Sequence, residues 1–315
     1  MYSYENYHKV KSEIEKRRLD AVAAAEARSE ELRARVPEIR KIDEELGATG
    51  MLIFRTAING GDLGAIRSRN EALQKRRREL IVSLGLPEDY TDVKYHCKKC
   101  SDSGYIDTKM CSCMREELVK ATIASSGIGN LIKTQSFENF RLDYYEYDPK
   151  VYDAMRRNLD GAISYVTRFP ERHGQLLMIG KTGTGKTHLS TAIARALIER
   201  GYDVIYDSVQ NILADFEREK FRSGYSEEES RTAKYFDCDL LIIDDLGTEF
   251  QTAFTVSCLY NILTTRQNSN KGIIISTNYT PEEIRDKYED RIYSRLIGRG
   301  VDILPFYGKD RRVSK

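Results

Sequence analysis

Apolar and polar positions in the C-terminal half of the chain follow a repeating pattern, in which short apolar runs alternate with longer segments of helical periodicity. The apolar runs are expected to be strands and lie at 175–179, 203–206, 239–243, 272–276 and 301–304. The segments beside them are expected to be helices and lie at 151–168, 186–200, 208–222, near 227–235, 252–268, 281–287 and 290–297. This alternation predicts an α/β fold with a parallel sheet and helices on both of its faces.

The N-terminal region has a sparser pattern. Residues 1–46 are rich in Glu, Lys, Arg and Ala, which favour helix, and their apolar residues recur at helical spacing. We expect Pro37 to end or kink the helix near Val36, and Gly47 to stop it. A short helix, a turn and a further helix are expected at 49–57, 59–62 and about 63–84. Because these apolar stripes are too narrow to fill a large core, we expect the helices to pack on each other or on a partner.

Length and charge place broad limits on the protein. A chain of 315 residues can hold two domains, and a formal net charge of +1 neither requires nor excludes a nucleic-acid partner. The first 18 residues lack the apolar segment of a signal peptide, and no apolar run approaches the roughly 20 residues that span a bilayer. We therefore expect a cytoplasmic protein with no membrane partner. The pattern predicts a helical N-terminal domain, a linker and an α/β domain, at 1–120, 121–150 and 151–315.

Four of the six cysteines are clustered in the N-terminal domain. They form a C-x₂-C pair and a C-x-C pair, namely Cys97, Cys100, Cys111 and Cys113. Structural disulfides are rare in the cytosol, so the cluster predicts a metal site at about 95–115. Four thiolates favour a closed tetrahedral Zn²⁺ site that stabilises the fold. Two alternatives stay open, which are an iron–sulfur cluster and a zinc site in which His96 replaces one thiolate.

The segment GKTGTGKT, from Gly180 to Thr187, stands between a predicted strand and a predicted helix. It fits the phosphate-binding pattern G-x-x-x-x-G-K-[ST] in the strand–loop–helix setting that this motif requires. The glycines let backbone N–H groups turn toward a phosphate, and Lys186 is expected to reach the β- and γ-phosphates of ATP. The predicted cofactor-binding residues of this loop are Gly180, Lys181, Thr182, Gly183, Thr184, Gly185, Lys186, Thr187 and His188.

Two further predicted strands end in polar residues that could complete an ATPase site. One is followed by Asp244 and Asp245, and the other by Asn278. Because the carboxyl ends of parallel strands meet at one edge of a sheet, these side chains are expected near the phosphate-binding loop. We expect Asp244 to bind Mg²⁺ together with Thr187. Asp245, or alternatively Glu249, is the candidate for orienting the attacking water, and Asn278 could hold that water or the γ-phosphate.

The motifs SFENFRL, GKTGTGKT, LLIIDDLGTE, ISTN, RIYSRLIGRG and YGKDRR make the region from Phe137 to Arg312 resemble the DnaC/DnaI-type bacterial helicase loaders and the related IstB-like transposition ATPases. Both groups are AAA+ proteins, so the resemblance implies an AAA+ P-loop domain with little or no helical lid. It implies that Asn278 is the sensor 1 residue, Arg295 the arginine finger and Arg312 a nucleotide-binding sensor 2 residue. Phe137 and Phe140 would lie beside the adenine. The predicted catalytic residues are Lys186, Asp244, Asp245, Asn278 and Arg295.

The resemblance further implies an ATP-dependent loader of the hexameric replicative DNA helicase. Its N-terminal domain would bind the helicase, its AAA+ domain would bind ATP and single-stranded DNA, and its subunits would associate through ATP sites completed by Arg295. DNA contact would come from interleaved basic and aromatic residues, namely Arg218, Lys220, Phe221, Arg222 and Tyr225. The neighbouring Glu227, Glu228 and Glu229 would repel phosphate. Two alternatives are an IstB-like transposition helper and a nucleotide-dependent adaptor with little hydrolysis, in which Asp245 is too short to act as a base.

Overall fold

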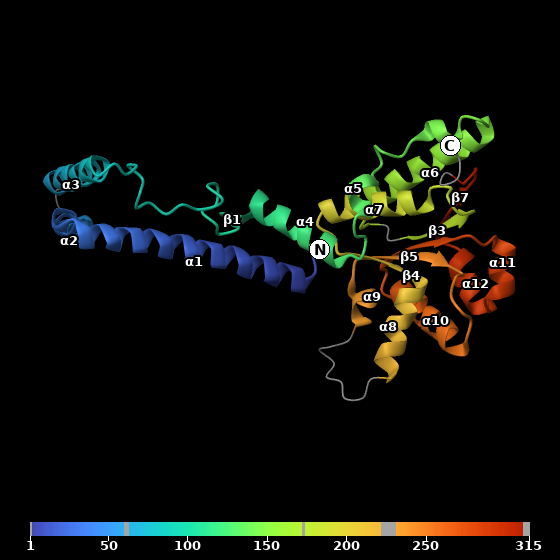
Figure 1. Cartoon of the computed structure of the whole chain (residues 1–315). Coiled ribbons are helices and arrows are strands. Elements are labelled where there is room, and N and C mark those ends of the chain that lie inside the picture. The colour runs from blue at the N-terminus through green and yellow to red at the C-terminus, as the bar shows by residue number, and fades with distance from the viewer. Residues whose placement is uncertain (1, 60–62, 172–173, 222–230, 311–315) are drawn as a thin grey trace. The chain divides into compact units, whose positions relative to one another are not determined.

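The chain forms two compact units in the computed structural model (Figure 1), which describes residues 2–59, 63–171, 174–221 and 231–310. The larger unit contains residues up to Val10 and from Arg115 onward, and the smaller unit contains Lys11 to Met114. The parallel sheet lies in the larger unit. The smaller unit is mainly helical and contains the four clustered cysteines.

A five-stranded parallel sheet is the centre of the larger unit. Its strands are β3 (Gln175–Gly180), β4 (Val204–Ser208), β5 (Leu240–Leu246), β6 (Gly272–Thr277) and β7 (Val301–Phe306). They are ordered β4-β5-β6-β3-β7, and each neighbouring pair is parallel. All five predicted strands are present, which confirms the predicted α/β fold. The carboxyl ends of β3, β5 and β6 therefore lie side by side at one edge of the sheet.

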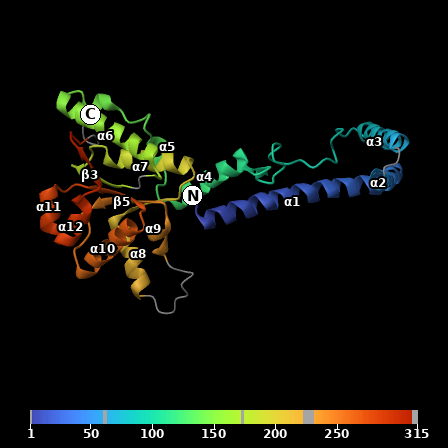
Figure 2. The same cartoon turned by 180° about the vertical axis from the view of Figure 1, so that it is seen from behind.

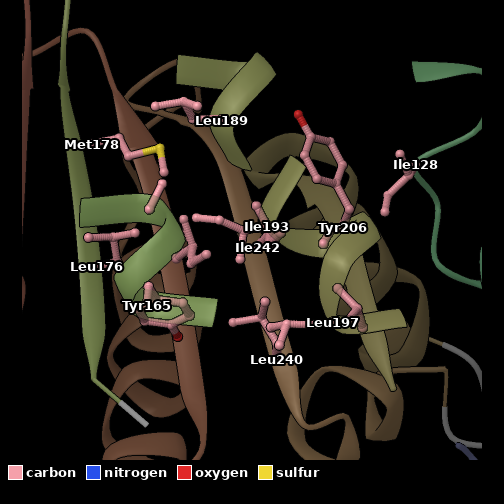
Figure 3. Close-up of a cluster of buried hydrophobic side chains, with 14 of the residues drawn as sticks. Ile128, Tyr165, Leu176, Met178, Leu189, Ile193, Leu197, Tyr206, Leu240 and Ile242 are labelled. Carbon is pink, nitrogen blue, oxygen red and sulfur yellow. The ribbon is translucent and has the colours of Figure 1, made fainter. Parts of the chain in front are cut away.

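Helices cover both faces of this sheet, as Figure 1 and Figure 2 show. One face carries α5 (Leu131–Thr134), α6 (Pro149–Arg168) and α7 (Lys186–Glu199). The other face carries α8 (Val209–Phe221), α9 (Ala233–Asp237), α10 (Ala253–Asn268), α11 (Pro281–Lys287) and α12 (Asp290–Ile297). Alternate strand residues point to opposite faces, so Leu176 and Ile242 pack in the first core (Figure 3), whereas Leu177 and Leu241 pack in the second.

The segment 121–150, which was expected to be a linker, packs against the core of the larger unit. It contains the end of α4 (Ser112–Ser125), α5 and a short 3-10 helix, η1 (Leu142–Tyr145). Ile128, Ile132, Phe140 and Tyr145 are all buried in the first core. Their burial was not visible in the sequence because loops and four-residue helices are too short to show a periodic pattern of apolar residues.

The smaller unit is built mainly from helices. They are α1 (Tyr4–Arg35), which begins in the larger unit, α2 (Pro37–Ile58) and α3 (Gly64–Ser83). Pro37 occupies the first turn of α2, and Val36 before it is extended, so α1 ends where the proline predicts. The buried residues Leu32, Ile39 and Ile81 form the small core between these helices. No helix in the described parts of the chain is both long and apolar enough to cross a membrane.

The predicted helix stop at Gly47 is wrong, because α2 continues through this residue to Ile58 and includes the short helix expected at 49–57. The continuation is stabilised by α3, which packs along α2. Thr49 Oγ1 accepts a hydrogen bond of 2.9 Å from Asn70 Nδ2 across this pair of helices. A glycine inside a helix costs about 1 kcal/mol relative to alanine, and packing against a second helix is sufficient to offset that cost.

Arg266 on α10 is a fully buried cation that holds the second core together. Its guanidinium donates to the carbonyl oxygen of Tyr235 at 2.8 Å, of Gly272 at 2.7 Å and of Asp239 at 3.2 Å. These three carbonyls belong to α9 and to the starts of β5 and β6. One side chain therefore joins a short helix to two strands at the amino edge of the sheet.

We expect Arg266→Met to destabilise the larger unit by about 3 kcal/mol, because methionine fills similar space but removes the guanidinium donors from these buried carbonyls. The unfolding midpoint in urea measures the effect. Arg156, which is exposed on α6, supplies the matched control. Arg156→Met is expected to change stability by less than about 0.5 kcal/mol. Equal midpoints for the two variants would show that the Arg266 hydrogen bonds contribute little.

Candidate functional site

The phosphate-binding loop connects the carboxyl end of β3 to the start of α7 at Lys186. Two of its glycines are required by close contacts. A Cβ at Gly180 would lie 2.3 Å from the carbonyl oxygen of Phe306, and one at Gly185, where φ is +104°, would lie 2.9 Å from the Tyr145 hydroxyl. That hydroxyl donates a hydrogen bond of 2.8 Å to the carbonyl oxygen of Thr184. The loop is therefore fixed by β7 and by the segment before α6. The role of Tyr145 in this contact could not be predicted from the sequence, because it depends on a residue 39 positions away.

Lys186 is buried and directs its ammonium group into the middle of this loop. The Nζ atom donates to the carbonyl oxygens of Gly180 and Lys181 and, at 2.7 Å, to the side-chain oxygen of Asn278. Asn278 follows β6, so the structure brings together two residues that are 92 positions apart. They border a cavity of about 230 Å³, which is lined by Gln135, Thr182, Gly183, Gly185, Lys186, Thr187, His188, Asp245 and Asn278.

Asp244 and Asp245 lie where β5 ends beside this cavity. Thr187 Oγ1 is 3.5 Å from Asp244 Oδ2, so the hydroxyl and the carboxylate predicted to share a metal ion are neighbours. The pairing of β5 with β6 shifts register between Ile243 and Leu246. Asp245 within this irregularity has φ +54°, and it lines the cavity. The change in backbone direction explains how two consecutive carboxylates reach different parts of one site.

Glu249, the alternative candidate for orienting water, has its carboxylate engaged elsewhere. It is buried, it accepts a hydrogen bond of 2.8 Å from the Gly247 amide, and its second oxygen accepts from the Tyr288 hydroxyl. It is absent from the residues that line the cavity. The geometry therefore favours Asp245 over Glu249, whose carboxylate instead fixes the loop that follows β5.

His188 and Phe140 form one side of the cavity region. The His188 ring stands edge-on to Phe140 with 5.3 Å between ring centroids, and its Nε2 lies 2.9 Å from the carbonyl oxygen of Ser136. Phe140 is buried, whereas Phe137 is half-buried against the first core. The FENF segment thus lies next to the start of α7, where the resemblance expects an adenine.

Arg295 lies at the opposite edge of the sheet from the loop. A polar cavity of about 510 Å³ there is lined by the first residues of β3 and β7, Gln175 and Val301, and by Arg291, Arg295 and Arg299. Figure 1 shows α12, which carries Arg295, on the face opposite α7. The phosphate-binding loop follows the carboxyl end of β3, so Arg295 is separated from it by the length of that strand.

The Arg295 guanidinium is held in place by two side chains of α10. Its Nη1 donates to Gln267 Oε1 at 2.8 Å, and the group stacks 5.1 Å from the centre of the Tyr260 ring. Arg291 lies 5.2 Å from the same ring. Hydrogen bonding and cation–π contact keep Arg295 ordered at this surface cavity, and Arg291 also forms an ion pair of 2.6 Å with Glu289.

The predicted DNA-contacting residues are only partly described. Arg218 near the end of α8 is 3.3 Å from Asp215, and Lys220 lies 4.7 Å from the centre of the Phe254 ring. Phe221 is the last residue of this helix. Arg222, Tyr225, the three glutamates that follow and the sensor candidate Arg312 lie outside the described residues.

The four clustered cysteines bring their sulfur atoms together in the smaller unit. All four Sγ atoms lie within 4.8 Å of one another, with 3.8 Å between Cys97 and Cys111 and 3.5 Å between Cys100 and Cys113. The two pairs come from the loop before β1 (Tyr105–Ile106) and from the junction of β2 (Lys109–Met110) with α4. His96 is not part of this group.

The loop that carries the first cysteine pair is shaped by a buried carboxylate. Asp102 accepts hydrogen bonds of 2.8 Å from the amides of His96 and Cys97. The backbone N–H groups of Cys100 and Lys99 lower the pKa of the Cys97 thiol to about 7, whereas burial raises the pKa of Cys113. A metal ion displaces such protons, because thiolates are its ligands.

A family profile decides the relationship of the chain to known proteins. The family described as "IstB-like ATP binding protein" matches residues 128–298, which is more than half of the chain. The chain belongs to this family. The matched region of this IstB-like protein contains the phosphate-binding loop, the two polar strand ends with Asp244, Asp245 and Asn278, and Arg295.

Several known proteins are similar to this IstB-like chain. "Replicative helicase loader DnaC" of Escherichia coli (strain K12) is 28% identical over 178 residues, which are 56% of this chain and 69% of that protein. "Phage-like element PBSX protein XkdC" of Bacillus subtilis (strain 168) is 28% identical over 227 residues, covering 67% and 82%. A crystal structure of DnaI aligns with a TM-score of 0.47 and 21% identity, over 58% of this chain and 93% of that one.

The cavity of this IstB-like protein fits the nucleotide and Mg²⁺ that an ATP-binding family implies. A buried ammonium group that contacts neutral carbonyl and amide oxygens is a site where an anion is favourable. Phosphate oxygens are such anions, and Lys186 could exchange these contacts for them. Thr187 and Asp244 offer the hydroxyl and carboxylate oxygens that Mg²⁺ prefers. The residues present therefore match the chemistry of both groups.

The cysteine cluster of the IstB-like protein fits a tetrahedral Zn²⁺ ion. Four sulfur atoms at a Zn–S distance of about 2.3 Å stand roughly 3.8 Å from one another. The separations of 3.8 Å and 3.5 Å agree with this geometry. A C-x-C pair that spans a strand end and the first turn of a helix can thus supply two ligands to one ion.

Proposed function

We propose that this protein is an ATP-dependent loader of a replicative DNA helicase. The observation that carries the proposal is the arrangement of the larger unit, in which Lys186, Asp244 and Asn278 meet at one edge of the sheet while Arg295 stands at the other. Such a site is incomplete within one chain and is completed when two copies meet. The similarity to the helicase loader DnaC supports the choice of helicase loading as the purpose of that assembly.

Each polar residue of the cavity has a distinct role in this proposal. The backbone of the loop and Lys186 bind the phosphates of ATP, and Asn278 orients the γ-phosphate or the attacking water. Thr187 and Asp244 hold Mg²⁺, which supplies positive charge to the β- and γ-phosphate oxygens when it is bound. Asp245 at the cavity accepts a proton from the water or directs it.

Arg295 acts on the nucleotide of a neighbouring copy. Its cavity at the amino edge of the sheet is polar and also contains Arg291 and Arg299, so this surface is suited to an anion presented by a partner. Tyr260 and Gln267 orient the guanidinium before the partner arrives. ATP binding therefore favours assembly, and hydrolysis weakens it.

We expect Arg295→Ala to leave ATP binding within about twofold of the unchanged protein but to reduce assembly-stimulated hydrolysis by about 10³-fold, the lower end of the range for an arginine supplied in trans. Hydrolysis is measured as phosphate release against protein concentration, with single-stranded DNA and the helicase present. Unchanged hydrolysis would show that Arg295 does not act on the neighbouring nucleotide.

The smaller unit binds the helicase in this proposal. Large apolar side chains that are normally buried are exposed on the second half of α2, where Met51 is 66%, Leu52 50% and Ile58 69% exposed. An exposed apolar surface of this kind is typical of a protein-binding site. The basic and aromatic residues at the end of α8, such as Lys220, are the proposed contact for single-stranded DNA.

Co-purification with the replicative helicase tests the proposed function. We expect the helicase to bind the full-length chain with or without ATP, and to be loaded onto single-stranded DNA only with ATP. Failure to bind the helicase under either condition would overturn the proposal. The second candidate, a transposition helper, is favoured by the family name, and a parallel pull-down with a transposase distinguishes it.

The third candidate, a nucleotide-dependent adaptor with little hydrolysis, depends on Asp245 being too short to act on water. A turnover assay with single-stranded DNA and the helicase present distinguishes an enzyme from an adaptor. Multiple turnovers per chain support the loader with an active ATPase, whereas binding without turnover supports the adaptor.

A further inference from the structure

Two hydroxyl groups from neighbouring strands hold the carboxylate of Asp244. The Tyr206 hydroxyl, on β4, donates to Asp244 Oδ2, and the Ser276 hydroxyl, on β6, donates to Asp244 Oδ1. β4 and β6 are the two neighbours of β5 in the sheet. Each carboxylate oxygen therefore has a donor from a different side, and the side chain is fixed at the end of its strand.

Ser276 also fixes the residue that follows. Its hydroxyl oxygen accepts a hydrogen bond of 3.0 Å from the Asp245 amide while its proton goes to Asp244. One serine thus holds the carboxylate of the first aspartate and the backbone of the second. Asp245 needs such support because its φ of +54° is unfavourable for a residue with a side chain.

Tyr206 is itself anchored from the outer edge of the sheet. Its amide donates a hydrogen bond of 2.7 Å to the carbonyl oxygen of Ser126, directly after α4. Gly127 lets the chain come this close, because a Cβ there would lie 2.3 Å from the Tyr206 carbonyl oxygen. Figure 3 shows the Tyr206 ring beside Ile128, with its hydroxyl beyond the apolar side chains. The hydroxyl position is therefore set by packing.

The Tyr206 hydroxyl is a closer donor to Asp244 Oδ2 than the Thr187 hydroxyl is. Thr187 lies 3.5 Å from the same carboxylate oxygen, a longer contact than a normal hydrogen bond between oxygens. Without the tyrosine hydroxyl, Asp244 Oδ2 would lose its close donor, and the carboxylate would be held on its other oxygen only, by Ser276.

We infer that Tyr206 is a positioning residue for the Mg²⁺ site, which orients Asp244 through its hydroxyl and has Ser276 as its counterpart. This inference rests on the proposed function, in which Asp244 and Thr187 hold Mg²⁺. Groups that orient a metal ligand typically change metal affinity by 10–100-fold when they are removed. The hydroxyl has no role in binding the nucleotide itself, so its effect should depend on the metal.

The test compares Tyr206→Phe with Tyr165→Phe, a matched control from the same core. The Tyr165 hydroxyl is also buried, but it donates to the carbonyl oxygen of Gly174, at the opposite edge of the sheet. Binding of a fluorescent ATP analogue is measured in EDTA and across a Mg²⁺ titration, and the thermal unfolding midpoint is recorded for both. We expect Tyr206→Phe to require about tenfold more Mg²⁺ for half-maximal enhancement of binding, with unchanged affinity in EDTA.

Ser276→Ala provides a second variant that removes the other donor. It is expected to shift the Mg²⁺ titration in the same direction, whereas Tyr165→Phe is not. An unshifted titration for Tyr206→Phe, or an equal loss of affinity in EDTA, would overturn the inference while leaving the proposed function standing. A wild-type protein whose nucleotide binding does not respond to Mg²⁺ would overturn the proposed metal site and the inference with it.

Discussion

Lys186→Ala is expected to weaken ATP binding by about 100-fold or more and to abolish helicase loading. The Lys186 ammonium is buried at the centre of the phosphate-binding loop, and its contacts with Lys181 and Asn278 show that it can reach the carboxyl ends of both β3 and β6. Alanine lacks the positive charge that Lys186 places beside the phosphates. Charge-assisted hydrogen bonds are among the strongest in proteins, so their loss should weaken binding strongly. Equilibrium binding of a fluorescent ATP analogue measures the loss.

Helicase binding should survive the Lys186→Ala substitution, because the smaller unit is proposed to bind the helicase. Lys150→Ala, which removes an exposed lysine of α6, is the control and should bind ATP normally. A folded Lys186→Ala protein that no longer binds the helicase would contradict the division of labour between the two units. ATP binding at the level of the Lys150→Ala control would contradict the assignment of Lys186.

Removal of the metal is expected to unfold the cysteine-containing part of the smaller unit. Structural zinc contributes on the order of 10 kcal/mol in small metal-dependent folds, and two-residue strands such as β1 and β2 have little other stabilisation. Cys100→Ser, at a buried ligand position, should reduce the zinc content from about one ion per chain to near zero. Elemental analysis measures the zinc content, and limited proteolysis of the segment between α3 and β2 measures the unfolding.

Cys258→Ser is the matched control for this experiment, because Cys258 is also a buried thiol but lies on α10, outside the cluster. It should retain the zinc and the resistance to protease. ATP binding by the larger unit should be similar in both variants. Equal metal contents would exclude the four-cysteine site, and iron with visible absorbance in place of zinc would support the iron–sulfur alternative.

The sequence predicted helices and strands well where apolar residues form a continuous run or recur at helical spacing. The apolar runs that became β3, β5 and β6 are buried on both faces, so each gives a continuous apolar strand signal. The outer strand β7 is largely exposed, although its apolar residues were still sufficient to predict it. The prediction failed at Gly47, where contact with α3 decides the length of α2. It also gave no indication that Phe140 and Tyr145 are buried in the core, because a loop and a four-residue 3-10 helix are too short to show a periodic apolar pattern.

The residues of the candidate site were likewise only partly predictable from the sequence. Lys186, Asp244 and Asn278 could be proposed from sequence because each follows a recognisable strand, and parallel strands bring their carboxyl ends together. Tyr206 and Ser276 could not, since both lie inside ordinary strands and become relevant only through the order β4-β5-β6. Glu249 looked equivalent to Asp245 until the structure showed its carboxylate bound to Gly247 and Tyr288.

The sequence by itself determined the α/β class, the phosphate-binding loop and the grouping of four thiols, because each depends on residues that are close along the chain. Tertiary structure alone decided which groups hold Asp244, which edge of the sheet carries Arg295 and which acidic residue faces the cavity. These are contacts between residues tens of positions apart. Their geometry follows from strand order and side-chain packing. Neither of these can be predicted from the local sequence pattern.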